Sequence, residues 1–153
     1  MVTHYVGSMG SRSEHISIVI DRPPSQVYDF ASDPVNLPKW AAGLAGSTVE
    51  RNGQQWFTES PMGRVTFTFA PRNDFGVLDH DVTLSSGEIV HNPLRVLRDG
   101  DACEVVFTLR RRPEMTDEDF ERDADAVARD LAMLKSILED PVALGNVDDP
   151  HRG

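Results

Sequence analysis

The chain has 153 residues, a formal net charge of −10 at pH 7 and a sequence pI near 4.8. This length suits a single domain, because domains commonly contain about 100 to 150 residues. The negative charge argues against a nucleic-acid partner or an anionic membrane surface, since both require clustered positive charge. The one basic run, Arg110 to Arg112, directly precedes Pro113, which favours a solvated strand edge over a phosphate site.

Cysteine content and hydropathy indicate the compartment. Cys103 is the only cysteine, so no internal disulfide can form and no oxidising compartment is required. We expect it to be a buried, unreactive side chain. No apolar run approaches about 18 residues, and no signal peptide is recognisable. The sequence therefore predicts a cytoplasmic protein with no stable membrane insertion.

The first part of the chain predicts one strand and two short helices. Residues 1–13 lack periodicity and are expected to be a flexible leader to a single domain at 14–139. Alternating isoleucines at 15–21 predict a strand with one buried side. Pro23 and Pro24 then predict the first turn of a helix, and a second short helix is expected at 35–41.

Turn signals divide the middle of the chain into a run of antiparallel strands. Asn52-Gly53 and Asp99-Gly100 are the strongest signals, because both residue types tolerate positive φ in hairpin turns. They place Arg51 opposite Gln54 and Arg98 opposite Asp101. With the first strand the expected count is seven. The other six expected strands are 45–51, 54–59, 63–70, 75–84, 88–98 and 101–112.

The hairpin around residues 85–87 brings polar residues to the inward face. A three-residue loop there places His80 opposite Asn92 and Leu78 opposite Leu94. Inward residues of both strands are otherwise aliphatic. Their neighbours Asp79, Asp81 and Arg95 have the opposite parity and are expected to be solvated.

The segment 116–139 predicts one long amphipathic helix. Thr116 is the expected N-cap, followed by three acidic residues in the first turn. An apolar stripe follows the helical period, with Ala124 and Ala128 in its N-terminal half and leucines in its C-terminal half. Small side chains predict the roomiest part of any cavity beneath the two alanines. The acidic segment 140–153 is expected to be a flexible tail.

The order of these elements predicts an α+β domain with a seven-stranded curved antiparallel sheet wrapped around the C-terminal helix. Four segments accompany that order: Ile16-Ser17-Ile18, Arg22-Pro23-Pro24-Ser25-Gln26-Val27-Tyr28-Asp29-Phe30, Asp33-Pro34 up to Trp40, and the terminal helix. Together they resemble the START-like superfamily, also called SRPBCC or polyketide cyclase/dehydrase-type, which has the helix-grip fold. Similar bacterial members without an assigned activity carry phrases like those at 75–80 and 92–96.

The resemblance implies a deep, mostly apolar cavity between sheet and helix. The expected polar pair is His80 with Asn92, where His80 is a satisfied core histidine, a ligand contact or an acid–base group. Trp40 is expected to be a core or lid anchor. The expected apolar ligand-binding residues are Trp56, Phe67, Leu78, Val90, Leu94, Val105 and Phe107 on the sheet, with Ala124 and Ala128 on the helix.

Three functions remain open from the sequence. The leading hypothesis is binding of a hydrophobic or aromatic small molecule, for transport or sequestration. The alternatives are a cyclase or aromatase that uses His80 as acid or base, and an interaction module like the activators of the Hsp90 chaperone. We expect no cofactor and no metal, because the histidines show no ligand spacing and no nucleotide fingerprint is present. The protein is expected to be a monomer or a homodimer, since Ala126, Met133 and Ile137 form a second apolar strip.

Overall fold

The computed structural model describes residues 12–60 and 63–141 of the chain. The expected leader and tail lie largely outside these residues, although Ser13 already belongs to the first strand. The helical elements are α1 (Pro24–Ala31), η2 (Pro34–Asn36), α2 (Leu37–Trp40), η3 (Ala42–Leu44) and α3 (Asp117–Glu139). The strands are β1 (Ser13–Ile20), β2 (Glu50–Asn52), β3 (Gln55–Ser60), β4 (Gly63–Phe69), β5 (His80–Thr83), β6 (Ile89–Asn92), β7 (Leu94–Asp99) and β8 (Ala102–Arg110).

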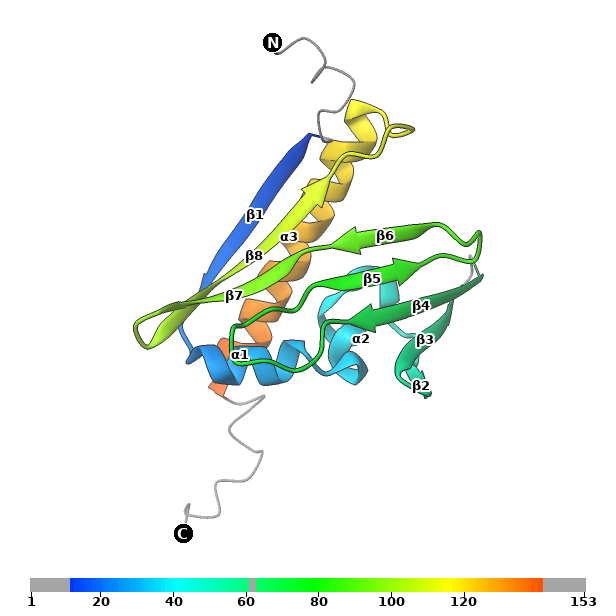
Figure 1. The fold of residues 1–153 in the computed structure, drawn as a ribbon. Helices are drawn as coiled ribbons and strands as arrows, with labels where there is room; N and C mark the ends of the chain where they lie inside the picture. Colours follow the sequence, from blue (N-terminus) through cyan, green and yellow to red (C-terminus); the bar gives the residue numbers. More distant parts are fainter. Residues whose placement is uncertain (1–11, 61–62, 142–153) are drawn as a thin grey trace, which may run out of the picture.

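The prediction of a single seven-stranded sheet is wrong. The described residues form eight strands in two antiparallel sheets, one in the order β1-β8-β7 and the other in the order β2-β3-β4-β5-β6. Figure 1 shows α3 running along β1 and β8, while α1 and α2 lie near the C-terminal half of α3. The architecture is therefore α+β with a long C-terminal helix against antiparallel strands, as the helix-grip prediction requires.

The sheets separate at Pro93, which divides the expected strand 88–98 into β6 and β7. Proline has no N–H to donate to a ladder, and the next N–H, that of Leu94, is bonded to a side chain, Asp79 Oδ1, at 3.0 Å. The pairing register nevertheless continues across the break. Val82 faces Val90 and His80 faces Asn92, as predicted, and Val77 forms an isolated bridge with Arg95.

Two hairpin registers differ from the prediction for one shared reason. The loops are Gly53-Gln54 and Gly100-Asp101, so that Asn52 pairs with Gln55 and Asp99 pairs with Ala102. In both cases the glycine, at φ +66 and +60, takes the first loop position, where only residues tolerant of positive φ are accepted. The asparagine and the aspartate end the preceding strands. Relative to the predicted register, each pairing is shifted by an even number of residues, so the side chains that were expected to face inward still do.

The long helix α3 begins and ends as predicted. Thr116 Oγ1 accepts the N–H of Asp119 at 3.0 Å, and the Asp119 carboxylate accepts the N–H of Thr116 at 3.3 Å, which completes a capping box. At the other end, Lys135 Nζ donates to Val19 O at 2.7 Å and to Glu139 Oε2 at 2.6 Å. These contacts attach the helix to β1.

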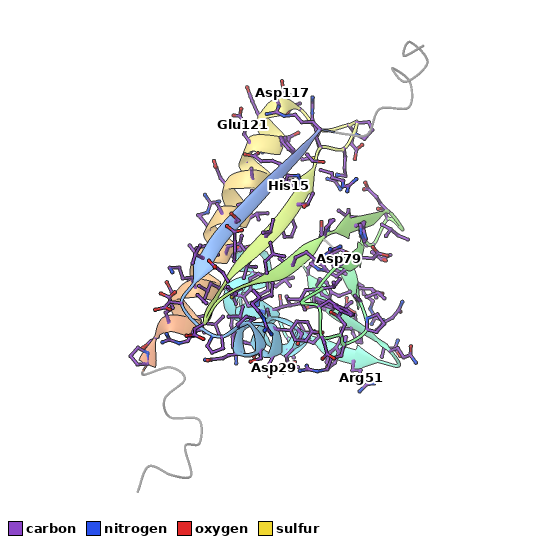
Figure 2. The ribbon with its side chains drawn as sticks, turned by 60° about the vertical axis from the view of Figure 1, so that its left-hand side comes forward. His15, Asp29, Arg51, Asp79, Asp117 and Glu121 are labelled. Atoms are coloured by element: carbon purple, nitrogen blue, oxygen red, sulfur yellow. The ribbon has the colours of Figure 1, made fainter. Side chains whose placement is uncertain are left out.

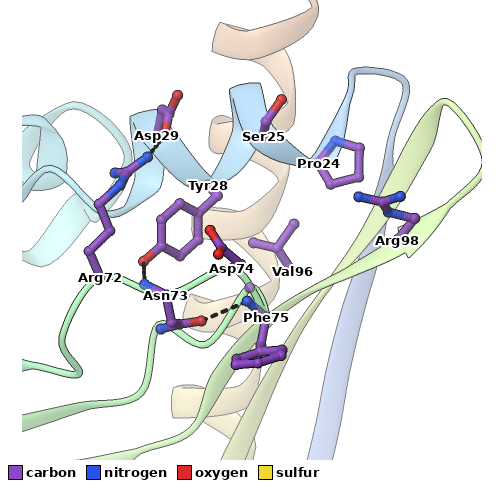
Figure 3. A pocket seen from close by; sticks show the side chains of 11 residues that line it. Pro24, Ser25, Tyr28, Asp29, Arg72, Asn73, Asp74, Phe75, Val96 and Arg98 are labelled. Carbon is purple, nitrogen blue, oxygen red and sulfur yellow. Dashed lines mark hydrogen bonds and ion pairs between the residues drawn. The ribbon is translucent and has the colours of Figure 1, made fainter.

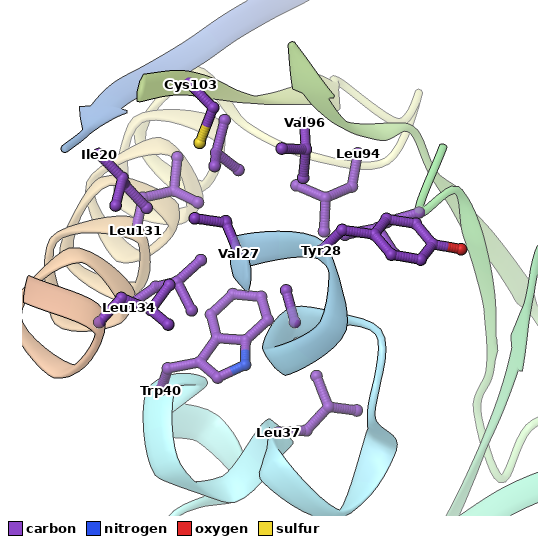
Figure 4. Packing of buried hydrophobic residues seen from close by; sticks show 14 of the residues in the cluster. Ile20, Val27, Tyr28, Leu37, Trp40, Leu94, Val96, Cys103, Leu131 and Leu134 are labelled. Carbon is purple, nitrogen blue, oxygen red and sulfur yellow. The ribbon is translucent and has the colours of Figure 1, made fainter. Parts of the chain in front are cut away.

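The hydrophobic core lies between α3, α1 and the β1-β8-β7 sheet. Figure 4 shows Leu131 and Leu134 of α3 facing Val27 of α1, with Ile20 and Cys103 above them and Trp40 of α2 beside them. Polar side chains surround this core on the outside, as Figure 2 shows for Asp117 and Glu121 on α3. No helix in residues 12–60 and 63–141 is long and apolar enough to cross a membrane.

Candidate functional site

A cavity of about 200 Å³ lies between α2, α3 and the inner face of the five-stranded sheet. We call it the chamber. Three phenylalanines and several aliphatic side chains make its walls, and His80, Asn92, Trp40 and Asp130 bring polar atoms. The full lining is Leu37, Trp40, Ala41, Leu44, Phe67, Phe69, His80, Asn92, Leu94, Phe107, Val127 and Asp130.

A groove of about 450 Å³ adjoins the chamber between β6, β8 and α3. Asn92, Phe107, Val127 and Asp130 line both spaces, so these four residues form the boundary between an inner chamber and an outer groove. The groove rim carries Arg110 to Arg112. Two of these arginines are already neutralised, since Arg111 pairs with Asp117, and Arg112 with Glu88 and Glu114.

His80 is the polar side chain of the sheet wall with the most defined geometry. Its ring stacks on Phe69 with centroids 4.9 Å apart and meets Phe107 edge to face at 6.5 Å. Its Nδ1 lies 2.9 Å from Leu78 O. Burial lowers the pKa of His80 below its ordinary value of 6.5, so the imidazole is neutral at pH 7.

Two further polar groups of the chamber lining belong to α2 and α3. Trp40 is 7% exposed, and its Nε1 is a buried side-chain atom without a hydrogen-bond partner among the described residues. Asp130 is partly buried, which raises the pKa of its carboxyl group, although its Oδ1 accepts the N–H of Ala42 at 3.1 Å. An orphaned buried donor costs stability, and a ligand acceptor would satisfy it.

The expected site residues divide into three groups. Phe67, His80, Asn92, Leu94 and Phe107 lie in the chamber wall, and Val90 lies in the groove. Leu78 and Val105 are fully buried in the core, and Trp56 packs against that core from its edge. Ala124 and Ala128 lie outside both linings, and Ala128 is exposed.

The chamber and the groove therefore lie on a different flank of α3 from the one that carries Ala124 and Ala128, so the expected position of the cavity was wrong. The helix residues that line the chamber and groove are Asp123, Ala126, Val127 and Asp130, spaced by three and four positions on the other side of the leucine stripe. Sequence reasoning missed Asp130. The available signal was its position three residues from Val127 and four from Leu134, on the buried side of the helix.

Asp79 and Arg95 were also expected to be solvated; this holds for the exposed Arg95 and is wrong for Asp79. Arg95 donates from Nε to Asp79 Oδ1 at 2.8 Å and from a terminal nitrogen to Oδ2 at 2.7 Å. The guanidinium holds the pKa of Asp79 below its ordinary value. The Asp79 side chain is only 19% exposed, because it also accepts the N–H of Leu94.

A separate surface cleft of about 450 Å³ lies between α1, the 72–76 loop and β7. Figure 3 shows that Asn73 organises this loop, accepting from Phe75 N–H and donating its own N–H to Tyr28 Oη. Arg72 pairs with Asp29 beside it. None of its lining residues belongs to the chamber.

In residues 12–60 and 63–141, no group of three or more His, Cys, Asp or Glu side chains could hold a metal ion. Burial raises the pKa of the Cys103 thiol, so the thiolate that nucleophilic chemistry requires is disfavoured. The polar side chains that line the chamber, among them His80 and Asn92, can donate and accept hydrogen bonds.

The model of one protein family, described as polyketide cyclase / dehydrase and lipid transport, matches residues 13–139. The chain belongs to this family. The match runs from the start of β1 to the end of α3 and confirms the START-like resemblance. No curated protein matches the sequence.

Solved structures share the fold at low sequence identity. The Aha1 dimer from Colwellia psychrerythraea has a TM-score of 0.67 at 17% identity, over 84% of this chain and 97% of that chain. The XoxI protein of Bacillus cereus has a TM-score of 0.65 at 16% identity, over 84% and 96%. DynU16, a protein of the dynemicin biosynthetic locus, has a TM-score of 0.64 at 10% identity, over 84% of this chain and 47% of its own.

Proposed function

We propose that the protein binds a small hydrophobic or aromatic molecule in the chamber, with any longer part of the ligand lying in the groove. The family supports ligand binding of this general kind. The observation that carries the proposal is the chamber itself: an apolar, aromatic-walled space that also holds a buried donor without a partner.

The dimensions of the two spaces suit this function. A cavity of about 150 Å³ in a protein core can hold benzene, so a chamber of about 200 Å³ suits one aromatic ring or a compact fused pair. Sites for larger ligands commonly measure about 300 to 1,000 Å³, and the groove of about 450 Å³ supplies that additional room. Phe67, Phe69 and Phe107 offer ring faces and edges for aromatic contact.

A pair of variants on adjacent residues of α3 tests the proposal. Val127 lines both spaces, whereas Ala128 is exposed. Val127→Phe places a ring in the chamber and is expected to weaken the binding of 2-naphthol at least tenfold. Ala128→Phe adds a ring to the same helix on the solvent side and is expected to leave affinity within twofold. Titration calorimetry with naphthalene, 2-naphthol, a fatty acid and a quinone measures both.

Absence of binding by every probe would contradict the proposal, and so would equal affinity of both variants. Thermal unfolding of each variant serves as the control for folding. Because Val127→Phe fills empty volume, its melting temperature is expected to stay at or above that of the wild type, which separates a lost site from a lost fold.

A cyclase or aromatase activity is the second candidate, and one observation favours it. The His80 imidazole is neutral, and its Nε2 has no partner among the described residues, which is the state that a general base requires. Under this hypothesis His80→Gln abolishes turnover of an enolisable polyketide analogue while its binding persists. Unchanged turnover would exclude His80 as the base.

The interaction-module hypothesis predicts a filled core and a contiguous exposed apolar patch. The chamber argues against the first requirement. On the β1-β8-β7 sheet, the exposed side chains Val19 of β1 and Leu97 of β7 both lie opposite Glu104 of β8, so a charged residue stands between them and they do not form a contiguous apolar patch. The shared fold with the Aha1 dimer supports the architecture alone.

A further inference from the structure

We propose that the chamber selects ligands that donate a hydrogen bond, such as phenols and enols, and that the Asp79–Arg95 ion pair outside the chamber sets this selectivity. The inference rests on the proposed ligand-binding function. It concerns the direction of the hydrogen bond at His80 and the residues that fix it.

One backbone hydrogen bond is missing from the ladder between the two sheets. Directly paired antiparallel residues exchange two N–H···O bonds in the closely spaced type of pair. Leu78 and Leu94 make only one of them, from Leu78 N to Leu94 O at 2.8 Å. The N–H of Leu94 donates to Asp79 Oδ1 at 3.0 Å instead. Leu78 O is therefore left without its ladder donor.

His80 supplies the missing donor. Its Nδ1 lies 2.9 Å from Leu78 O, and a carbonyl oxygen can only accept a hydrogen bond. Nδ1 must therefore carry the proton. In a neutral imidazole the other nitrogen, Nε2, then holds a lone pair and can only accept.

The position of Nε2 makes that lone pair available to a ligand. Nδ1 is turned toward the backbone of its own strand, so Nε2 lies at the end of the ring that is farther from the strand. His80 lines the chamber, and the ring makes no hydrogen bond in the described residues other than the one at Nδ1. A bound hydroxyl group would donate to Nε2.

Asp79 is a positioning residue for this tautomer, and Arg95 holds it in place. The two bonds from Arg95, at 2.8 and 2.7 Å, orient both carboxylate oxygens. As an ionised carboxylate, Asp79 can only accept, so it keeps the N–H of Leu94 away from Leu78 O. Neither residue lines the chamber, which separates their effect from direct ligand contact.

The α3 wall of the chamber also presents hydrogen-bond acceptors. The Asp130 carboxylate from α3 faces the same space and presents acceptor oxygens, one of which already takes the Ala42 N–H. Asp81, which precedes Val82 on β5, pairs with His91 on the outer face. The acceptors at Nε2 and Asp130 favour a ligand hydroxyl over a ligand carbonyl, and the oxygen of the same hydroxyl can accept from Trp40 Nε1.

The test compares 2-naphthol with naphthalene, which differ by one hydroxyl group, by titration calorimetry on the full chain. The wild type is expected to bind 2-naphthol about tenfold more tightly, as one good hydrogen bond of about 1 to 1.5 kcal/mol allows. His80→Asn keeps a donor near the Nδ1 position and removes Nε2, so the ratio is expected to fall to about twofold or less. His80→Gln restores an amide near the Nε2 position and is expected to recover part of the ratio.

The tautomer is measured separately, by long-range ¹⁵N–¹H correlation spectra of protein labelled at histidine. The wild type is expected to carry its His80 proton on Nδ1. Asp79→Ala returns the Leu94 N–H to Leu78 O, and we expect the proton to shift toward Nε2 with loss of the naphthol preference. Asp81→Ala is the matched control, because Asp81 lies on the same outward face but pairs with His91, whereas the Leu94 N–H donates to Asp79, and it is expected to change neither.

The outcomes distinguish this inference from the proposed function. Equal affinity of the wild type for both probes, or a proton on Nε2 in the wild type, overturns the selectivity and leaves ligand binding standing. Binding of neither probe overturns the proposed function, and the selectivity with it. If Asp79→Ala does not fold, Arg95→Met tests the same positioning role, and the two wild-type measurements need no variant.

Discussion

Gly76 is the position at which a single methyl group is expected to have the largest effect on the joint between the sheets. Its φ is +72, and a Cβ added there would lie 2.2 Å from Val96 O. The carbonyl of Gly76 also accepts the N–H of Val96 at 2.8 Å. Gly76→Ala therefore meets a backbone conformation that alanine resists and a backbone atom that it cannot pass.

The loss of stability expected for Gly76→Ala has two parts. The left-handed conformation costs alanine about 1 to 2 kcal/mol. Relieving the contact requires β7 to move from Gly76, which adds about 1 to 3 kcal/mol for overpacking and about 1 kcal/mol for the hydrogen bond. Together these reduce the free energy of unfolding by about 3 to 6 kcal/mol, a large part of the stability of a domain of this size.

Gly100→Ala is the matched control. Gly100 has a similar φ, +60, but an added Cβ would meet nothing within 4 Å. The free energy of unfolding of Gly100→Ala should therefore fall only by the cost of the backbone conformation, about 1 to 2 kcal/mol. Urea unfolding of both variants and the wild type, with equal m-values as the check on two-state behaviour, gives the difference. If the two variants lose stability within about 0.5 kcal/mol of each other, the steric argument is refuted.

Three other predictions follow from polar contacts. Burial lowers the pKa of His80, so between the lowered pKa and about 6.5 the unfolded chain binds a proton that the folded chain lacks. The free energy of unfolding should therefore fall on acidification through this range, by at most about 1.4 kcal/mol per pH unit. Parallel curves of unfolding free energy against pH for the wild type and His80→Asn would contradict this. Thr116→Ala removes the N-cap acceptor of α3 and should cost about 1 kcal/mol in urea unfolding, with no change in ligand affinity. Lys135→Met removes the donor to Val19 O and should cost about 1 kcal/mol; an unchanged rate of amide exchange in β1 would show that the contact does not hold the helix to the strand.

Local signals in the sequence were sufficient for the long helix and for one decisive register. The caps and period of α3 depend on neighbouring residues, so Thr116 to Glu139 was predictable to within a residue. The loop at 85–87 and the alternation beside it likewise placed His80 opposite Asn92. The same reasoning placed both residues on the inward face, and both line the chamber.

The two glycine hairpins show where local signals end. Asn52-Gly53 and Asp99-Gly100 predicted turns correctly, but two adjacent residues that both tolerate positive φ leave two frames for the loop. Pairing with the rest of the sheet chose the later frame in each case. The division of the sheet at Pro93 was also decided by a distant group, since Asp79 takes the N–H of Leu94.

The sequence by itself determined the helix-grip order of elements, the long helix and the inward position of His80, because each follows from periodicity and turn chemistry within one segment. Only the tertiary structure decided which flank of α3 faces the chamber, that Trp40 and Asp130 line it together with His80, and that Nδ1 of that ring lies beside Leu78 O. Those features depend on how α2 and the sheet pack against the helix and on a carboxylate that replaces one ladder bond. Both are long-range arrangements of groups, and no local pattern encodes them.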